Sequence, residues 1–195
     1  MPTLQNAKAQ IAVIVGSNRR ESINRKLAQA LIKLGAGKIE AKIVRIDDLP
    51  IYNQDNEANL PAEVVRFKDE IKKADGVLII TPEHNRSMPT VLKNAIDWGA
   101  RPYGSSVWPG KPGFITGTSP GAIGTALVQA NLRTVMLGLG MTLLGGESYV
   151  QFKPNLVDEQ GNVTDESTKK FLQSFVDRFA KLVERLSPAA VRAAA

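Results

Sequence analysis

Short apolar runs alternate along the chain with longer segments in which apolar residues recur at helical spacing. Apolar runs of about four to eight residues are typical of strands, and a spacing of about three or four is typical of amphipathic helices. The predicted strands span residues 11–15, 40–46, 77–80, 113–117 and 141–144. The predicted helices span residues 23–34, 61–71, 89–98, 127–139 and 166–186.

This alternation of strands and helices predicts an α/β domain with a parallel sheet and right-handed crossovers. The run at residues 77–80 is wholly apolar, which is typical of a central strand covered on both faces. The polar segment at residues 151–164 is a predicted loop. We expect residues 1–195 to form a single domain, with loose ends at residues 1–9 and 188–195.

Composition narrows the chemistry that such a domain could perform. The chain has no cysteine and one histidine, which excludes thiolate metal sites and thiol nucleophiles and leaves little material for a Ser-His-Asp triad. Redox chemistry would therefore need a bound cofactor. The net charge of +6 comes from dispersed basic residues, which favours phosphorylated small molecules over nucleic acid as partners. We expect no signal peptide, no membrane span and a cytoplasmic location.

Three loops that follow predicted strands are rich in Gly, Ser, Thr, Asn or Pro: residues 16–24, 81–89 and 117–124. The carboxyl ends of parallel strands lie at one edge of a sheet, where ligands bind at the topological switch point. We therefore expect these three loops to converge on one ligand.

The first loop, residues 16–24, joins a strand to a helix and so directs backbone N–H groups and a positive helix end at one place. It lacks the Gly-Lys-Ser/Thr ending of a nucleoside triphosphate loop and, with Gly16 alone, the glycines of a dinucleotide loop. The side-chain donors in their place favour a terminal monophosphate. A simpler alternative is that Ser22 only caps the helix and Arg19 lies exposed. Asp47, after the second strand, could contact a ribose, although a turn-forming aspartate is the more common case.

Longer motifs make the pattern specific. The chain carries Gly-Ser-x-Arg-x-x-Ser-x-Asn at residues 16–24, Pro-Glu-x-Asn-x-Ser-x-Pro at 82–89 and Leu-Lys-Asn-Ala-Ile-Asp-Trp at 92–98. In this order they resemble the motifs of the NAD(P)H-dependent FMN reductases, a flavodoxin-like family that includes quinone, chromate and azo-dye reductases. The resemblance covers residues 10–185. It implies a doubly wound, five-stranded parallel sheet in the order 2-1-3-4-5, with helices on both faces.

The resemblance also implies which residues hold the cofactor. Those expected to contact FMN lie on all three loops: Ser17, Arg19, Ser22, Ile23, Asn24, Pro82, Glu83, His84, Asn85, Ser87, Thr118, Ser119 and Gly121. The first loop would bind the phosphate, the second would line the ring and ribityl chain, and small residues of the third would let the backbone approach the ring. The family commonly has tyrosine where this chain has His84, which either packs neutrally or alters the flavin's surroundings. Arg101 would either attract nicotinamide phosphates or merely lie at a helix end.

The implied activity is that of an FMN-dependent NAD(P)H oxidoreductase. NADH or NADPH would reduce bound FMN, which would then reduce a quinone, chromate, an azo compound or free flavin by a ping-pong mechanism. No catalytic side chain and no metal are expected, because the cofactor carries the chemistry. The resemblance also implies a homodimer or homotetramer. Three alternatives stay open: a flavodoxin-like electron carrier, a flavin-binding regulatory module without direct NAD(P)H turnover, and a phosphate-ester enzyme without flavin.

Overall fold

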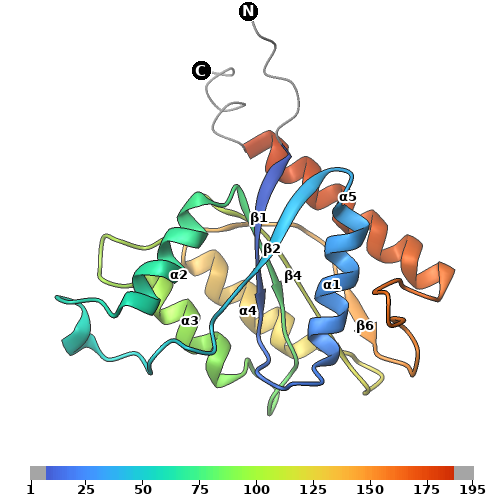
Figure 1. The fold of residues 1–195 in the computed structure, drawn as a ribbon, viewed down its shortest axis with the longest axis horizontal. Coiled ribbons are helices and arrows are strands. Elements are labelled where there is room, and N and C mark those ends of the chain that lie inside the picture. The colour runs from blue at the N-terminus through green and yellow to red at the C-terminus, as the bar shows by residue number, and fades with distance from the viewer. Residues whose placement is uncertain (1–7, 187–195) are drawn as a thin grey trace, which may run out of the picture.

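The computed structural model describes residues 8–186. Within them the strands form one six-stranded parallel sheet, in which β2-β1-β3-β4-β5 lie side by side and β6 pairs with β4. Helices cover both faces of this sheet (Figure 1). The predicted α/β fold and strand order are confirmed. Most of the predicted loose ends lie outside the described residues, but Ala9 already begins β1.

The strands are β1 (Ala9–Val15), β2 (Ile39–Val44), β3 (Gly76–Ile80), β4 (Pro112–Ser119), β5 (Thr142–Leu143) and β6 (Tyr149–Gln151). The helices are α1 (Ile23–Gly35), α2 (Ala62–Lys73), α3 (Thr90–Ala100), α4 (Ala126–Gly138) and α5 (Glu166–Leu186), with a short 3-10 turn, η1 (Gln54–Asn56). In the described part of the chain, no helix is both long and apolar enough to cross a membrane.

Strand β1 shows how one sheet serves two cores. Ile11, Val13 and Val15 pack in a core with α1 and α5, whereas Ala12 and Ile14 pack in a second core with α2, α3 and α4. All of these side chains are nearly fully buried. Burying a large aliphatic side chain contributes about 1.5–3 kcal/mol. The strand is therefore apolar along almost its whole length, and packing on both faces holds the loop that follows it.

The fifth strand position is split in two, which the sequence prediction missed. β5 pairs with the first residues of β4, whereas β6 pairs with the last ones. The strand predicted at residues 141–144 is therefore shorter than expected, and β6 ends where the loop predicted at 151–164 was to begin. A glycine pair separates the two pieces, and Gly146 adopts φ +96° there. Each piece is too short to display a strand period in the sequence.

The motif at residues 92–98 has a structural role on α3. The Asn94 side chain accepts a hydrogen bond from the Tyr52 backbone N–H (2.8 Å) and donates to the carbonyls of Leu49 (3.3 Å) and Pro50 (2.9 Å). The Trp98 indole N–H also donates to the Pro50 carbonyl, at 2.8 Å. These bonds attach the long segment after β2 to α3, which explains the motif without any contact to a ligand.

Lys68 is a buried cation between α2 and the end of α3. Its ammonium donates to the backbone carbonyls of Trp98 (3.3 Å), Ser105 (3.0 Å) and Arg101. The side chain is only 3% exposed. Burial, followed by the charge of Lys72, lowers the pKa of Lys68 from 10.5 to about 8, against the raising effect of the Glu57 carboxylate. The three carbonyls hold the ammonium where α3 ends.

We predict that stability will depend on the protonation of Lys68. Its pKa is lower in the folded chain than in the unfolded chain, so the unfolded chain binds more protons between pH 8 and 10.5. The stability of the wild type should therefore rise with pH in that window relative to Lys68→Met, by up to about 1.4 kcal/mol per pH unit. Urea unfolding at several pH values measures this difference. Lys73→Met, which changes an exposed lysine on α2, is the control. A difference in stability between the wild type and Lys68→Met that does not change with pH would contradict the prediction.

Candidate functional site

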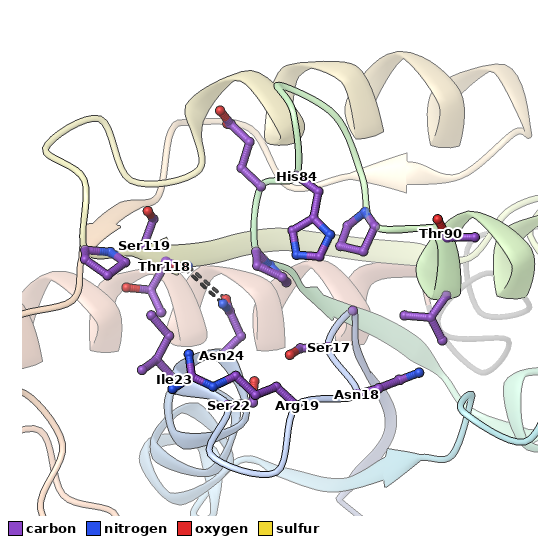
Figure 2. A pocket seen from close by; sticks show the side chains of 16 residues that line it. Ser17, Asn18, Arg19, Ser22, Ile23, Asn24, His84, Thr90, Thr118 and Ser119 are labelled. Atoms are coloured by element: carbon purple, nitrogen blue, oxygen red, sulfur yellow. Dashed lines mark hydrogen bonds between the residues drawn. The ribbon is translucent and has the colours of Figure 1, made fainter.

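The three loops predicted to converge do converge, on a cavity at the carboxyl edge of the sheet. The cavity measures about 600 Å³. Figure 2 shows His84 reaching into it from the second loop, across from Ser17 of the first. The lining residues come from all three loops and from the start of α3: Gly16, Ser17, Asn18, Arg19, Ser22, Ile23, Asn24, Pro82, Glu83, His84, Pro89, Thr90, Val91, Thr118, Ser119 and Pro120.

The first loop leaves β1 at a tightly packed glycine. The Gly16 N–H donates to the Ile80 carbonyl of β3 at 2.8 Å. A Cβ on Gly16 would lie 2.6 Å from the Thr81 hydroxyl oxygen, which is closer than real Cβ atoms come to other atoms. The loop then reaches Ser22, whose hydroxyl accepts from the Arg25 backbone N–H at 3.2 Å and caps α1. The capping role considered for Ser22 is confirmed.

The backbone of this loop carries hydrogen-bond donors that lack acceptors. Among the hydrogen bonds of residues 8–186, none is donated by the backbone N–H groups of residues 17–24. These donors stand at the positive end of α1, whose first turn contains no acidic residue. A helix N-terminus with free N–H groups attracts anions. The geometry is that of a small anion site.

Asn24 locks the first loop to the third. Its side-chain N–H donates to the Thr118 carbonyl at 3.0 Å, and its oxygen accepts from the Thr118 backbone N–H at 2.9 Å (Figure 2). Asn24 is 1% exposed. The Thr118 hydroxyl in turn donates to the Val150 carbonyl of β6 at 2.8 Å. Asn24 therefore holds two loops together, and the contact to phosphate that the resemblance implied stays a prediction.

Glu83 locks the second loop to α4 in a similar way. One oxygen of its carboxylate accepts from the backbone N–H groups of Leu127 and Val128, both at 3.1 Å. Thr125, which precedes α4, makes no side-chain cap, so Glu83 supplies it. A carboxylate at a helix N-terminus also complements the helix dipole. The charge of Glu83 is thereby directed at the helix.

The tip of the second loop is a tight hairpin turn. His84 and Ser87 exchange two backbone hydrogen bonds of 2.9 Å. Between them, Asn85 (φ 49°) and Arg86 (φ 66°) both have positive φ, as in a type I′ turn. Asparagine tolerates this conformation better than most residues, so the turn alone accounts for Asn85.

Gly117 brings the third loop against the second. A Cβ at Gly117 would overlap the Thr81 backbone carbonyl, so no larger residue could stand there without moving the strands. Thr118 and Ser119 continue from it along the cavity wall. Gly121 lies beyond them on the exposed turn, where its N–H donates to the Ser119 hydroxyl at 3.2 Å.

Most of the residues predicted for the site line the cavity. Three do not, namely Asn85, Ser87 and Gly121. Sequence reasoning also left out lining residues at the loop ends and at the start of α3: Gly16, Asn18, Pro89, Thr90, Val91 and Pro120. The first two lay inside the quoted motif, and Pro89 marked the predicted helix start, so the signal was available for these.

Arg101 lies away from the cavity lining and is held in an ion pair. Its guanidinium donates to the two carboxylate oxygens of Glu57, at 2.6 and 3.2 Å. The Tyr52 hydroxyl donates to the same carboxylate at 2.6 Å. Arg101, followed by Tyr52, lowers the pKa of Glu57 through these hydrogen bonds. In the described chain, the charge of Arg101 is thus balanced by Glu57.

Comparison with known proteins places these features in a family. Residues 9–154 match the family described as NADPH-dependent FMN reductase. The chain is 49% identical, over 89% of its length and 96% of the relative's, to a 2-hydroxy-1,4-benzoquinone reductase of a Burkholderia species. It is 48% identical to a quinone reductase of Pseudomonas putida, over 89% and 94% of the two chains.

Among solved structures, the chain resembles FerB of Paracoccus denitrificans, a flavoenzyme NAD(P)H:(acceptor) oxidoreductase. The two share 48% sequence identity with a TM-score of 0.89, covering 92% of this chain and 99% of FerB. An NADH:FMN oxidoreductase in its apo form has a TM-score of 0.70 at 19% identity, which shows a common fold.

We predict that the bond between the first and third loops stabilises the protein. Asn24→Ala should lower the free energy of unfolding by about 2–4 kcal/mol, because the buried N–H and carbonyl of Thr118 lose their partner. Asn18→Ala, on the exposed part of the same loop, should change it by less than about 0.5 kcal/mol. Urea unfolding compares the two variants. Equal losses in the free energy of unfolding would show that the two hydrogen bonds between Asn24 and Thr118 do not stabilise the protein.

Proposed function

The chain belongs to the NADPH-dependent FMN reductase family and is an FMN-dependent NAD(P)H oxidoreductase, and from this premise we propose that its three-loop cavity holds the FMN and that its acceptor is a quinone. The observation that carries the proposal is the row of unpartnered backbone N–H groups at residues 17–24 of the described chain. A terminal phosphate supplies the acceptor oxygens for such a row.

The first loop is suited to the phosphate end of FMN. Ser17 and Arg19 line the cavity beside the free N–H groups. The Ser22 hydroxyl accepts one bond from the helix and still has its own hydrogen to donate. Asn24 acts as a positioning residue, because both of its polar atoms are bonded to Thr118. Side-chain donors thus add to a backbone site whose shape is already fixed.

The rest of the cavity suits the ring end. Pro82 and Pro89 present apolar surface, with Val91 beside them, and such surfaces pack well against a flat aromatic group. His84 projects into the same space from the turn (Figure 2). We assign it a packing role against the ring, in place of the tyrosine common in the family. Asn85 and Ser87 then support the turn that carries His84.

The chain's own residues bind and orient, and they need not transfer protons. FMN held in this cavity would supply the redox chemistry between NAD(P)H and the acceptor. Three cavity side chains titrate or carry charge: Glu83 is occupied at the start of α4, Arg19 is a permanent cation, and His84 has the packing role assigned above. We therefore propose that no residue acts as a general base and that no metal takes part.

A quinone is the proposed acceptor because relatives at 48–49% identity are named quinone reductases. Donor and acceptor would use one exposed cavity in turn, which predicts a ping-pong mechanism. The same relatives favour turnover over the role of an electron carrier or a regulatory module.

We further propose a single-domain subunit that assembles into a homodimer or homotetramer through α3 and α4. All described strands join one sheet, which supports one domain. On and near α4, Ile123, Leu127 and Leu137 are 52%, 43% and 56% exposed, which leaves apolar surface for a second copy. A cytoplasmic location agrees with the use of NAD(P)H.

We predict that Arg19 recognises the phosphate. Arg19→Gln should weaken FMN binding about tenfold, the worth of one charge-assisted hydrogen bond, and leave riboflavin binding unchanged, because riboflavin has no phosphate. Flavin fluorescence quenching by the flavin-free full-length protein measures both. Arg20→Gln is the matched control, since Arg20 does not line the cavity. Equal losses for FMN and riboflavin would count against the proposed orientation.

We also predict the kinetic pattern. Initial rates measured at several NADPH and quinone concentrations should give parallel double-reciprocal lines, because both substrates use one site in turn. Intersecting lines would require a ternary complex and would exclude the single shared cavity.

A further inference from the structure

A second cavity adjoins the first on the other side of the phosphate loop. It measures about 340 Å³ and lies at the carboxyl ends of β1 and β2. Its lining comes from these strands, the first loop and α1: Val15, Ser17, Asn18, Arg25, Ile43, Val44, Arg45, Ile46 and Asp47. Ser17 and Asn18 line both cavities, so a single short stretch of loop separates them. A ligand that extends beyond the phosphate site would enter this second cavity.

The second cavity is cationic. Arg45 forms an ion pair with Asp47 at 2.9 Å and lies 3.7 Å from Asp48. Asp48 also pairs with Arg66, at 2.9 Å, so its charge is shared. Arg25 forms no ion pair within the described residues, and its charge is left for a ligand. Two arginines and one aspartate line the space, which favours an anion.

Apolar and acidic groups complete the lining. Ile43, which is only partly buried, offers aliphatic surface of the kind against which a base stacks. Asp47 lies three positions past the end of β2. In dinucleotide folds, an acid near the end of the second strand accepts hydrogen bonds from ribose hydroxyls. The pKa of Asp47 is lowered, chiefly by the hydrogen bond from Arg45 and to a smaller extent by the charge of Arg25. The carboxylate can therefore accept hydrogen bonds from ribose hydroxyls.

We propose that the second cavity binds the adenylate half of FAD, so that the protein accepts this flavin dinucleotide as well as FMN. The inference rests on the proposed function, because it begins from a flavin phosphate held at residues 17–22. In FAD the adenylate is joined to that phosphate, on the side away from the flavin ring. The second cavity begins at the same two residues, Ser17 and Asn18. Its volume lies within the range of about 300–1,000 Å³ that is usual for ligand sites.

Arg25 and Arg45 would face the added phosphate, and Asp47 the ribose. The same adenylate chemistry occurs in free adenine nucleotides and in NADPH. FAD is favoured over both because only its adenylate is covalently continuous with the phosphate that the first loop would hold.

A competition experiment tests the proposal on the full-length protein. The protein is equilibrated with equal concentrations of FMN and FAD, free flavin is removed, and the flavin retained is identified by chromatography. The wild type should retain FAD beside FMN. The double variant Arg25→Gln/Arg45→Gln should shift the ratio about tenfold or more towards FMN, since each arginine–phosphate bond is worth about that factor.

The controls separate this inference from the proposed function. Arg185→Gln is the control and should leave the ratio unchanged. Arg185 is exposed near the end of α5, and its neighbour Val183 packs against Gly76 at the start of β3. Excess AMP should shift the wild-type ratio towards FMN by competing for the adenylate site. Retention of FMN alone, or a ratio that the double variant does not change, would overturn the inference and leave the FMN site intact.

Two further outcomes would also overturn it. AMP or NADPH that binds in equilibrium dialysis and loses affinity in the double variant, without changing the FMN:FAD ratio, would make the cavity a site for free nucleotides. Retention of neither flavin would overturn the inference together with the proposed flavin site.

Discussion

The exit of the chain from β1 at Gly16 is the constraint on which the site depends. The Gly16 N–H bonds to the Ile80 carbonyl, and a Cβ at residue 16 would press on the Thr81 side chain, so the end of β1 lies close against the start of the second loop. Among the described residues, the N–H groups of the loop that follows have no partner, and they stand just before α1. A side chain at residue 16 would require the Thr81 side chain or the loop itself to move. The anion site is therefore a consequence of backbone packing.

The other two loops are held by side chains that do not need to touch the ligand. Asn24 joins the first loop to Thr118, and Glu83 joins the second loop to the start of α4. Both residues belong to motifs that resemble a flavin site, and in both cases the visible partner is backbone. Each of these side chains bonds to backbone groups that would otherwise be unsatisfied. The cavity is thus organised before any ligand enters, which reduces the ordering that binding requires.

Much of this could be predicted from the sequence, and the exceptions have physical reasons. Period and composition are local properties, so the strands, the helices and the convergence of three loops followed from them. The split between β5 and β6 did not, because three residues cannot display a strand period. The partners of Asn24 and Glu83 lie 94 and 44 residues away in the chain. A motif shows that such residues matter, but only the fold shows that they bind backbone.

The central claim is that the backbone of residues 17–22 holds a flavin phosphate. Hydrogen exchange of these amides, followed by mass spectrometry with FMN or riboflavin added to the flavin-free full-length protein, tests it most directly. The account predicts that FMN slows exchange in the peptides covering residues 17–22 and that riboflavin, which lacks the phosphate, does not. Equal protection by both flavins, or protection by FMN confined to other loops, would contradict it.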